Sequence, residues 1–325
     1  MSKVLGLAAL LMTAAVVAAS PSHASLTTFQ SYSGNVAVST DGCGSVSQNC
    51  TLTANAQAGS TVVAAYLYTS TYFNTATPVG NTLNGSAVTY TTNLGTTSTC
   101  CTLTAFRADV TSIVAPIING GAGGAYNFAM LETSAAQDGE ALVVVYSNGA
   151  FATTSIGILD GFSATTGDST AINFATPLDP TAAGFHAEMR LGIGFSCCSQ
   201  ASTVSVNGTT ITNVAGNNDD GLGSISNGQL ITMGGDNDPF STLLPAYADD
   251  HERYNLVPYI NVGDTAINIR TVNPTNDDNI FLAVFNVTGD AGFNAPPPTN
   301  NVPEPGTLAL LGIGMAAMGL RGRKR

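Results

Sequence analysis

The segment Glu140-Ala141-Leu142-Val143-Val144-Val145-Tyr146 decides the fold class, because it is apolar at every position after its first residue. β-Branched and aromatic side chains in such a run favour a strand that is covered on both faces. Comparable runs occupy 61–68, 189–195 and 280–287, and glycine and proline separate them at intervals of roughly ten residues. Helical periodicity is scarce, although 105–114 fits either a short helix or the edge of a sheet. The chain is therefore predicted to be all-β, built as a β-sandwich or jelly roll.

Asn-Gly pairs predict tight hairpins in both halves of the chain. The first pair lies in Leu83-Asn84-Gly85-Ser86 and the second in Val206-Asn207-Gly208, each about twenty residues after a strong strand. Each half also ends in a very apolar strand and carries one adjacent pair of cysteines, although the turn and the cysteine pair come in reversed order. Asn-Gly turns also recur by chance in any β-protein. We expect two similar sandwich lobes, residues 25–160 and 161–290, the second with acidic loops.

The front of the chain predicts export. Lys3 is followed by an unbroken run of apolar and small residues, 4–19, and Ser22-His23-Ala24 places small residues three and one before a cleavage point. This arrangement is typical of a secretory signal peptide. Residues 1–24 are thus expected to pass the chain to the Sec export machinery and to be removed, so that the mature protein begins at Ser25.

The end of the chain has three parts in a fixed order. Val302-Pro303-Glu304-Pro305 is followed by the apolar run 306–320, and the basic end comprises Arg321, Arg323, Lys324 and Arg325. The 15 apolar residues are fewer than the ~20 that cross a membrane comfortably, but thinning of the bilayer can accommodate a short helix. The basic end should stay in the cytoplasm, with the prolines extended at the outer surface. The segment 302–325 therefore predicts a transmembrane helix behind an accessible motif.

This order of parts resembles the PEP-CTERM sorting signal of exopolysaccharide-producing Gram-negative bacteria. The resemblance implies that the membrane protease exosortase reads the signal and removes the tail, so that anchoring is transient and the protein ends at the cell surface or outside the cell. A C-terminal anchor that is never cleaved is the alternative. Residues 291–301 include Ala295-Pro296-Pro297-Pro298, which predicts an extended proline-rich linker ahead of the signal.

Five stretches of the exported part carry a second resemblance. They read Ala65-Tyr66-Leu67-Tyr68, Leu83-Asn84-Gly85, Ala108-Asp109-Val110-Thr111, Gly139-Glu140-Ala141-Leu142-Val143-Val144-Val145-Tyr146 and Leu159-Asp160-Gly161-Phe162. Together they are similar to an uncharacterised β-rich module of bacterial surface proteins. That similarity implies no activity.

The net charge of the exported part argues against nucleic-acid binding. Between the two terminal signals the chain has four arginines, no lysine and 20 acidic residues, which gives a net charge of −16. Nucleic-acid binding is not expected, because it needs many cations to neutralise phosphates. We expect instead an acidic surface that repels anionic lipid and attracts divalent cations.

All six cysteines lie in the exported part, where the compartment is oxidising, and they predict three disulfides with 15 possible pairings. Cys43 and Cys50 close a short loop and form the simplest pair. The adjacent pairs Cys100-Cys101 and Cys197-Cys198 could each form a vicinal bridge or be cross-linked to each other. Neither a zinc site nor a redox dithiol is expected, because the C-x2-C spacing and partner histidines are missing.

Acidic side chains gather in loops of the second half, beside asparagines and glycines. Carboxylate and carbonyl oxygens are the ligands that calcium prefers, so a calcium site assembled from several loops is a candidate. Solvated loops that keep a lysine-free protein soluble are the alternative. The candidate calcium ligands are Asp219, Asp220, Asp236, Asp238, Asp249, Asp250, Glu252, Asp277 and Asp278.

His251 lies within the acidic stretch 249–252, where it could serve as a general base or metal ligand, or pair with an acid in an exposed loop. No G-x-S-x-G, H-E-x-x-H or phosphate-binding loop motif occurs in the sequence. The sequence is therefore expected to encode a non-catalytic cell-surface or extracellular-matrix protein associated with exopolysaccharide and biofilm. A calcium-dependent glycan-binding module and a secreted hydrolase that uses the carboxylates of 249–252 are the alternatives.

Overall fold

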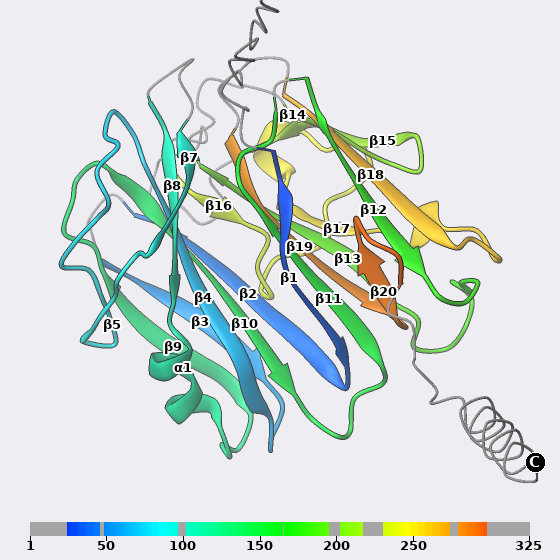
Figure 1. Ribbon diagram of the computed structural model, residues 1–325, viewed down its shortest axis with the longest axis horizontal. Coiled ribbons are helices and arrows are strands. Elements are labelled where there is room, and N and C mark those ends of the chain that lie inside the picture. Colours follow the sequence, from blue (N-terminus) through cyan, green and yellow to red (C-terminus); the bar gives the residue numbers. More distant parts are fainter. Residues whose placement is uncertain are drawn as a thin grey trace, which may run out of the picture.

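The computed structural model describes residues 25–45, 49–96, 102–164, 166–194, 202–216, 230–273 and 279–297. The prediction of an all-β protein is confirmed, since strands dominate the described chain and only one α-helix accompanies them there (Figure 1). The strands are β1 (Thr27–Gly34), β2 (Val36–Gly44), β3 (Asn49–Ala56), β4 (Thr61–Thr71), β5 (Thr82–Leu83), β6 (Ser86–Ala87), β7 (Thr92–Thr96), β8 (Thr104–Asp109), β9 (Gly124–Leu131), β10 (Gln137–Ser147), β11 (Thr154–Asp160), β12 (Asp168–Phe174), β13 (Ala187–Gly194), β14 (Ser202–Val206), β15 (Thr209–Ala215), β16 (Thr232–Met233), β17 (Arg253–Asn255), β18 (Ala266–Val272), β19 (Asn279–Thr288) and β20 (Ala291–Phe293). The helices are α1 (Thr111–Ile118) and the 3-10 turns η1 (Tyr247–Asp249) and η2 (Val257–Tyr259).

The described strands form four sheets that pair into two sandwiches. The first lobe has an inner sheet in the order β2-β10-β4-β8-β7 and an outer sheet in the order β3-β9-β5-β6. The second lobe has an inner sheet β1-β11-β19-β13-β16, with β17 also on β13, and an outer sheet β15-β14-β18-β12-β20. Figure 1 shows the two inner sheets side by side in the middle of the molecule.

Three apolar cores hold these layers together. One lies between the two sheets of the first lobe and includes Leu52 and Leu142. Another lies within the second lobe and includes Ile269 and Phe285. The third core joins the two inner sheets and includes Tyr68 and Phe281, whose rings lie 6.2 Å apart. The lobes therefore share a buried face and pack as one four-layered body.

The position of β10 between two apolar cores explains why its residues are apolar at consecutive positions. Leu142 and Val144 point into the core of the first lobe, whereas Ala141, Val143 and Val145 point into the core between the lobes. Each face of this strand is covered by another sheet, as the sequence predicts. The chain buries one face of each inner sheet against the other inner sheet and the opposite face against an outer sheet.

The two lobes have the same strand topology. The inner sheets follow the orders β2-β10-β4-β8 and β11-β19-β13-β17, and the outer sheets follow β3-β9-β5-β6 and β12-β18-β14-β15. Both outer sheets contain an Asn-Gly hairpin at the equivalent place, with φ of 48° and 74° at Asn84 and Gly85 and of 47° and 82° at Asn207 and Gly208. These angles fit type I′ turns, which need left-handed backbone at both central positions. The matching topology is typical of an internal repeat.

Two strands at the ends of the described chain depart from this repeat. β1 pairs with β11 in the inner sheet of the second lobe, and β20 pairs with β12 in its outer sheet. Thr28 Oγ1 donates to the carbonyl of Phe293 at 3.0 Å, which joins the two strands across the edge of the sandwich. By these pairings the chain changes lobe between β10 and β11, whereas the predicted division at residues 160 and 161 falls at the end of β11.

The ambiguous stretch 105–114 contains both of the predicted alternatives in succession. It begins in β8 and continues into α1, and Asp109 Oδ1 accepts a hydrogen bond from Thr111 N at 2.9 Å where the strand turns into the helix. Thr111 Oγ1 also accepts from Ala65 N at 2.9 Å, which fixes the helix start against β4. Sequence periodicity could not separate the two because each element is short.

Two hydrogen bonds and a disulfide connect β2 to β3 and close one edge of the first lobe. Alternate residues of β2 point towards β3 and satisfy backbone groups or a sulfur atom there. Asn55 N donates to Ser39 Oγ at 2.9 Å, Thr53 N donates to Asp41 Oδ2 at 2.6 Å, and Cys43 forms the predicted disulfide with Cys50. The free edge of β3 is thereby blocked, which limits edge-to-edge association.

Several predicted features lie outside the described residues. They are the signal peptide 1–24, Cys100, Cys101, Cys197 and Cys198, the end of the proline-rich linker, and the sorting segment 302–325. In the part of the chain that the structure does describe, no helix is long and apolar enough to cross a membrane.

Candidate functional site

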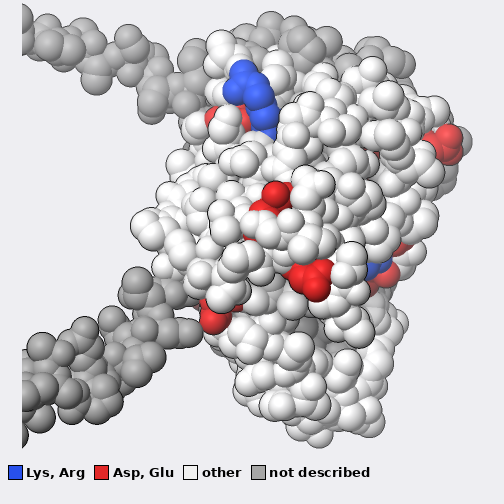
Figure 2. Space-filling view, turned by 90° about the vertical axis from the view of Figure 1, so that its right-hand side faces the viewer, with Lys and Arg blue, Asp and Glu red and all other residues white. Residues whose placement is uncertain are grey.

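Most carboxylates of the described chain lie inside the molecule, which corrects the expectation of an acidic surface. Nine of the 16 described acidic residues are buried, and on the face in Figure 2 charged atoms are few and scattered. Burial of carboxyl groups is tolerated where arginines, hydroxyls and backbone amides supply hydrogen bonds. The buried acids are Asp41, Glu132, Asp138, Glu140, Asp160, Asp168, Glu188, Asp250 and Glu252.

The predicted calcium ligands divide into separate groups. Asp249 is exposed, Asp236 and Asp238 are half-buried beside two arginines, and Asp250 and Glu252 are fully buried in another network. The other four, Asp219, Asp220, Asp277 and Asp278, lie outside the described residues. Among the described residues, no group of three acidic, histidine or cysteine side chains is arranged to hold a metal ion.

Arg190 is the centre of the charged network between the lobes. It lies in β13, is 3% exposed, and contacts Glu188 Oε1 through Nη2 at 2.7 Å and Asp236 Oδ1 through Nη1 at 2.5 Å. Nη1 also donates to Thr40 Oγ1 of the first lobe at 2.7 Å. Burial lowers the pKa of Arg190, but the charges of Glu188 and Asp236 outweigh burial and raise it. The guanidinium is therefore a fixed internal cation that contacts both lobes.

Arg253 faces Glu188 from the opposite side, because β17 pairs with β13 in the register Arg190 to Arg253. Its Nη2 lies 3.2 Å from Glu188 Oε2, and Nη1 donates to the carbonyl of Asp238 at 2.9 Å. Burial raises the pKa of Glu188, but the two arginines more than compensate and leave it below the ordinary value. Glu188 is thus an ionised carboxylate held between two guanidinium groups.

The loop 234–238 carries this network onto the edge of the first lobe. Asp236 N donates to the carbonyl of Thr40 at 3.0 Å, and Thr40 Oγ1 donates to the carbonyl of Gly234 at 2.6 Å. Ser39 Oγ donates to Asp236 Oδ2 at 2.5 Å. The loop therefore pairs with β2 almost as a further strand would, and it places Asp236 between the lobes.

Asp41 joins the same region from β2. Its pKa is raised to about 7, chiefly by burial and further by the charges of Asp238 and Asp236, while the hydrogen bond from Thr53 N acts in the opposite direction. Asp238 also has a raised pKa, chiefly because it is buried, with the Gly235 amide and His251 opposing. A carboxyl group with a raised pKa can exchange a proton near neutral pH, which makes Asp41 a candidate for proton transfer.

Asp250 and Glu252 share the hydroxyl group of Tyr254. Tyr254 Oη lies 2.5 Å from Asp250 Oδ1 and 3.0 Å from Glu252 Oε2, and Thr212 Oγ1 donates to Asp250 Oδ2 at 2.5 Å. Gly216 N donates to Glu252 Oε1 at 2.6 Å. Burial and the two carboxylates raise the pKa of Tyr254 well above its ordinary value. The hydroxyl therefore stays protonated and serves as a structural donor.

His251 lies between these two networks. Its backbone amide donates to Ser241 Oγ at 2.8 Å, and its ring charge favours the ionised form of Asp238. Glu252, the next residue, has a φ of 56°, a conformation that non-glycine residues rarely adopt. This strained turn points the side chains of Asp250 and Glu252 into the protein, so the acidic stretch 249–252 is not one solvated loop.

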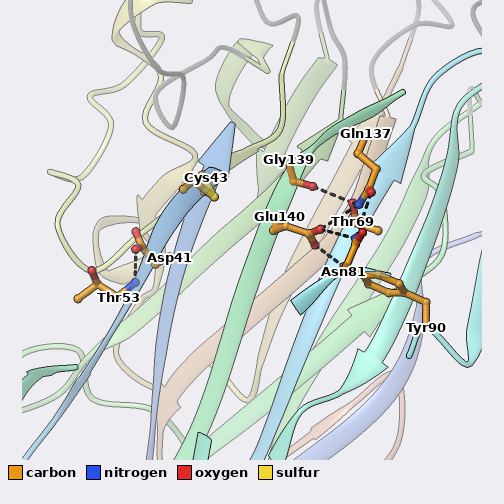
Figure 3. Close-up of a disulfide and its surroundings, with 10 residues drawn as sticks. Asp41, Cys43, Thr53, Thr69, Asn81, Tyr90, Gln137, Gly139 and Glu140 are labelled. Atoms are coloured by element: carbon orange, nitrogen blue, oxygen red, sulfur yellow. Dashed lines mark hydrogen bonds between the residues drawn. A yellow bond between two sulfur atoms is a disulfide. The ribbon is translucent and has the colours of Figure 1, made fainter. Parts of the chain in front are cut away.

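A third cluster of buried acids lies in the first lobe, beside the disulfide (Figure 3). Glu140 accepts hydrogen bonds from Tyr90 Oη at 2.7 Å and from Gln137 Nε2 at 3.0 Å. Glu132 is 2% exposed, and neither of its carboxyl oxygens has a hydrogen-bond partner among the described residues. Burial raises the pKa of Glu132 to about 8, and burial together with the charge of Glu132 raises the pKa of Glu140. With a pKa of about 8, the Glu132 carboxyl group is protonated at neutral pH.

Sequence reasoning found the acids of the second lobe but missed their partners. Glu188, Arg190 and Arg253 lie in or beside strands, where no local motif marks them. The sequence does show that arginine is scarce, because the exported part contains only four. Such a chain is expected to place its arginines where buried acids need a cation. The sequence also singles out Glu140, because this carboxylate directly precedes the apolar run 141–146.

Calcium binding through the acidic loops stays a prediction. Asp236, Asp238, Asp250 and Glu252 already accept hydrogen bonds from protein donors. A calcium ion would therefore depend chiefly on the other five candidates, Asp219, Asp220, Asp249, Asp277 and Asp278. We expect calcium to raise the melting temperature of the secreted protein and EDTA to reverse the rise. Changing these five aspartates to asparagine should abolish the calcium effect. Identical melting in calcium and EDTA, with no metal in the purified protein, would remove the site.

Comparison with known proteins identifies the end of the chain. Residues 301–324 match the PEP-CTERM protein-sorting motif. The chain is therefore an exosortase substrate that passes through a membrane-anchored stage and reaches the cell surface or the extracellular space. No curated protein matches the chain.

Solved structures share only a weak likeness with the folded part. A BuGH86 variant in complex with neoagarooctaose is 12% identical, with a TM-score of 0.23, and the match covers 82% of this chain and 35% of that one. A beta-porphyranase of glycoside hydrolase family 86 from the human gut bacterium Bacteroides plebeius is 9% identical, with a TM-score of 0.20 over 76% of this chain and 35% of that one. The chain thus corresponds to about a third of the length of these enzymes.

Proposed function

We propose that this protein is a non-catalytic component of the cell surface or extracellular matrix that associates with exopolysaccharide. The observation that carries the proposal is the combination of a sorting signal with an outer surface of hydroxyl and amide groups. The outward positions of the outer sheets are occupied mainly by serine, threonine and asparagine, for example Thr53, Ser169 and Asn268. Such groups hydrogen-bond to polysaccharide hydroxyls without attracting polyanions such as nucleic acid.

The internal charges support a structural role for the protein. Arg190 and Arg253 are used to bind Glu188, and Arg107 of the first lobe pairs with Asp160 of the second. Three of the four arginines of the exported part therefore contribute to joining strands or lobes. A body fixed in this way, with a disulfide at one edge, suits display outside the cell, where no chaperone or reductant repairs it.

Fractionation of the producing cells tests the proposal. The protein is expected in the matrix fraction of a polysaccharide-producing strain and in the culture medium of a strain that makes no exopolysaccharide. An equal distribution between matrix and medium in both strains would contradict the association.

Removal of residues 302–325 should keep the protein from the cell surface. The full-length chain is expected to become accessible to protease added outside intact cells, whereas the truncated chain remains in the periplasm because it lacks the exosortase signal. A matched variant with Pro303, Glu304 and Pro305 changed to alanine keeps the apolar helix and should stay membrane-bound. If that variant reached the surface and lost its tail as wild type does, the Pro-Glu-Pro motif would not be the recognised element.

A secreted hydrolase is the second candidate, favoured by the near-neutral pKa of Asp41 beside Asp238. It predicts turnover of a polysaccharide, ester or peptide that Asp41→Asn abolishes without unfolding the protein. Failure of such a substrate panel with the wild-type protein would remove this candidate.

A further inference from the structure

Arg270 is the one arginine of the exported part that forms no ion pair with a described residue. Within the described part of the chain its guanidinium donates only to neutral oxygens, the carbonyl of Thr166 at 3.0 Å and Ser169 Oγ at 3.5 Å. It is exposed, whereas the side chains of Arg107, Arg190 and Arg253 are 14%, 4% and 19% exposed and all contact carboxylates. In a chain so rich in carboxylates, an exposed cation that pairs with none of the described ones is available to an external anion.

The strands around Arg270 form a shallow groove in the outer sheet of the second lobe. Arg270 lies in β18, with Ser169 of β12 opposite on one side and Ser205 of β14 opposite on the other. Two residues along β18, Asn268 faces Ala171, and Gly208 of the Asn-Gly turn also lines the hollow. Because these neighbours are small, they leave a groove of about 510 Å³ beside the guanidinium. This volume lies within the usual range for small-ligand sites.

The groups in the groove have complementary roles. A guanidinium binds a carboxylate through two parallel N–H donors, which fixes the orientation of the ligand. The carboxamide of Asn268 makes no hydrogen bond within the described protein, so it can both donate and accept, and Ser205 lies on the same face. The groove thus offers one cation among neutral hydrogen-bonding groups.

The single arginine in the groove limits the kind of anionic ligand that the groove can bind. One arginine matches an anion that occurs once per sugar ring, whereas a phosphate polymer would need several cations along its length. The outer sheet of the first lobe has the equivalent strands β3, β9, β5 and β6, and none of them contains a charged residue. The second lobe therefore carries the cation at a place where the repeat does not require one.

We propose that this groove binds a uronic-acid unit of an acidic polysaccharide, with Arg270 holding the carboxylate and Asn268, Ser169 and Ser205 contacting ring hydroxyls. The inference rests on the proposed association with exopolysaccharide and adds the class of sugar and the place of contact. Burial of most of the described acids reduces the repulsion that such a polymer would meet at the surface.

Binding of trigalacturonate to the secreted protein tests the inference, with its methyl ester as the uncharged probe. We expect Arg270→Gln to weaken trigalacturonate binding at least tenfold, and the methyl ester to bind the wild-type protein at least tenfold more weakly than the acid. Gln57→Glu is the matched control: Gln57 is exposed in the first lobe, and the change alters net charge by the same amount. That control should bind as wild type does.

Three results would overturn the inference. They are wild-type affinity in Arg270→Gln, equal binding of the acid and its ester, and no binding of trigalacturonate by the wild-type protein. None of them touches the wider proposal, because co-fractionation with the matrix is measured separately on cells. If the protein stays in the matrix fraction but does not bind trigalacturonate, the proposed function stands and the proposed uronic-acid site does not.

Discussion

Replacing Arg190 by methionine is expected to lower the free energy of unfolding by about 3–5 kcal/mol, the usual cost of removing one partner from a buried ion pair. The methionine would leave Glu188 and Asp236 without their guanidinium, and Thr40 would lose the bond that reaches it from the second lobe. Urea denaturation of the secreted protein, followed by circular dichroism, measures the change.

Two variants make the Arg190 result specific. Arg270→Met removes an arginine from the surface and should change stability by no more than about 0.5 kcal/mol. Adding Glu188→Gln and Asp236→Asn to Arg190→Met should recover part of the loss, because the uncompensated charges then disappear. A loss below about 1 kcal/mol for Arg190→Met would show that the network between the lobes contributes little.

Stability should fall as pH rises from about 4 to about 8, the reverse of ordinary acid denaturation. Burial holds the pKa of Glu132 at about 8 and that of Asp41 at about 7, whereas the unfolded chain titrates these groups near 4.5 and 3.8. Between those values the folded protein keeps protons that the unfolded chain has released, so this stabilisation is complete below the unfolded pKa and lost as pH passes the folded one. When the folded and unfolded pKa of a group differ by one, its protonation changes stability by about 1.4 kcal/mol, so the two carboxyl groups together contribute several kcal/mol.

Glu132→Gln separates this effect from others that depend on pH. The variant keeps the shape of the side chain and has no proton to lose, so the decline in stability between pH 5 and pH 8 should become shallower. Asp179→Asn is the control, since Asp179 is exposed and should leave the slope unchanged. Glu188 acts in the opposite direction, because its lowered pKa gives stability that is lost on acidification. A wild-type protein whose stability rises steadily from pH 5 to pH 8 would contradict the burial of protonated carboxyl groups.

Local patterns in the sequence predicted the elements well. The apolar run at Glu140, the Asn-Gly turns and the Cys43–Cys50 loop each depend on residues close together in the chain, and each is present as predicted. The sorting motif is of the same kind, because its three parts are contiguous. Short-range physics is therefore enough to identify these features.

Long-range placement could not be predicted in the same way. Nothing local shows that β1 joins β11, that the loop 234–238 seals the edge of β2, or that the acids of 249–252 turn inward at Glu252. Net charge was the most misleading quantity, since it suggested an acidic surface while the fold buries most of the described carboxylates. Composition gives the number of charges, whereas only the pairing of strands decides which of them meet an arginine or another acid.

The most direct test of the account is retention of the secreted protein on purified exopolysaccharide from the producing organism, measured in calcium and again in EDTA. We expect the wild-type protein to be retained in calcium and Arg270→Gln to be retained more weakly. Loss of retention in EDTA would add that calcium in the acidic loops bridges protein and polymer. Passage of the wild-type protein through the column without delay in both buffers would contradict the proposed association.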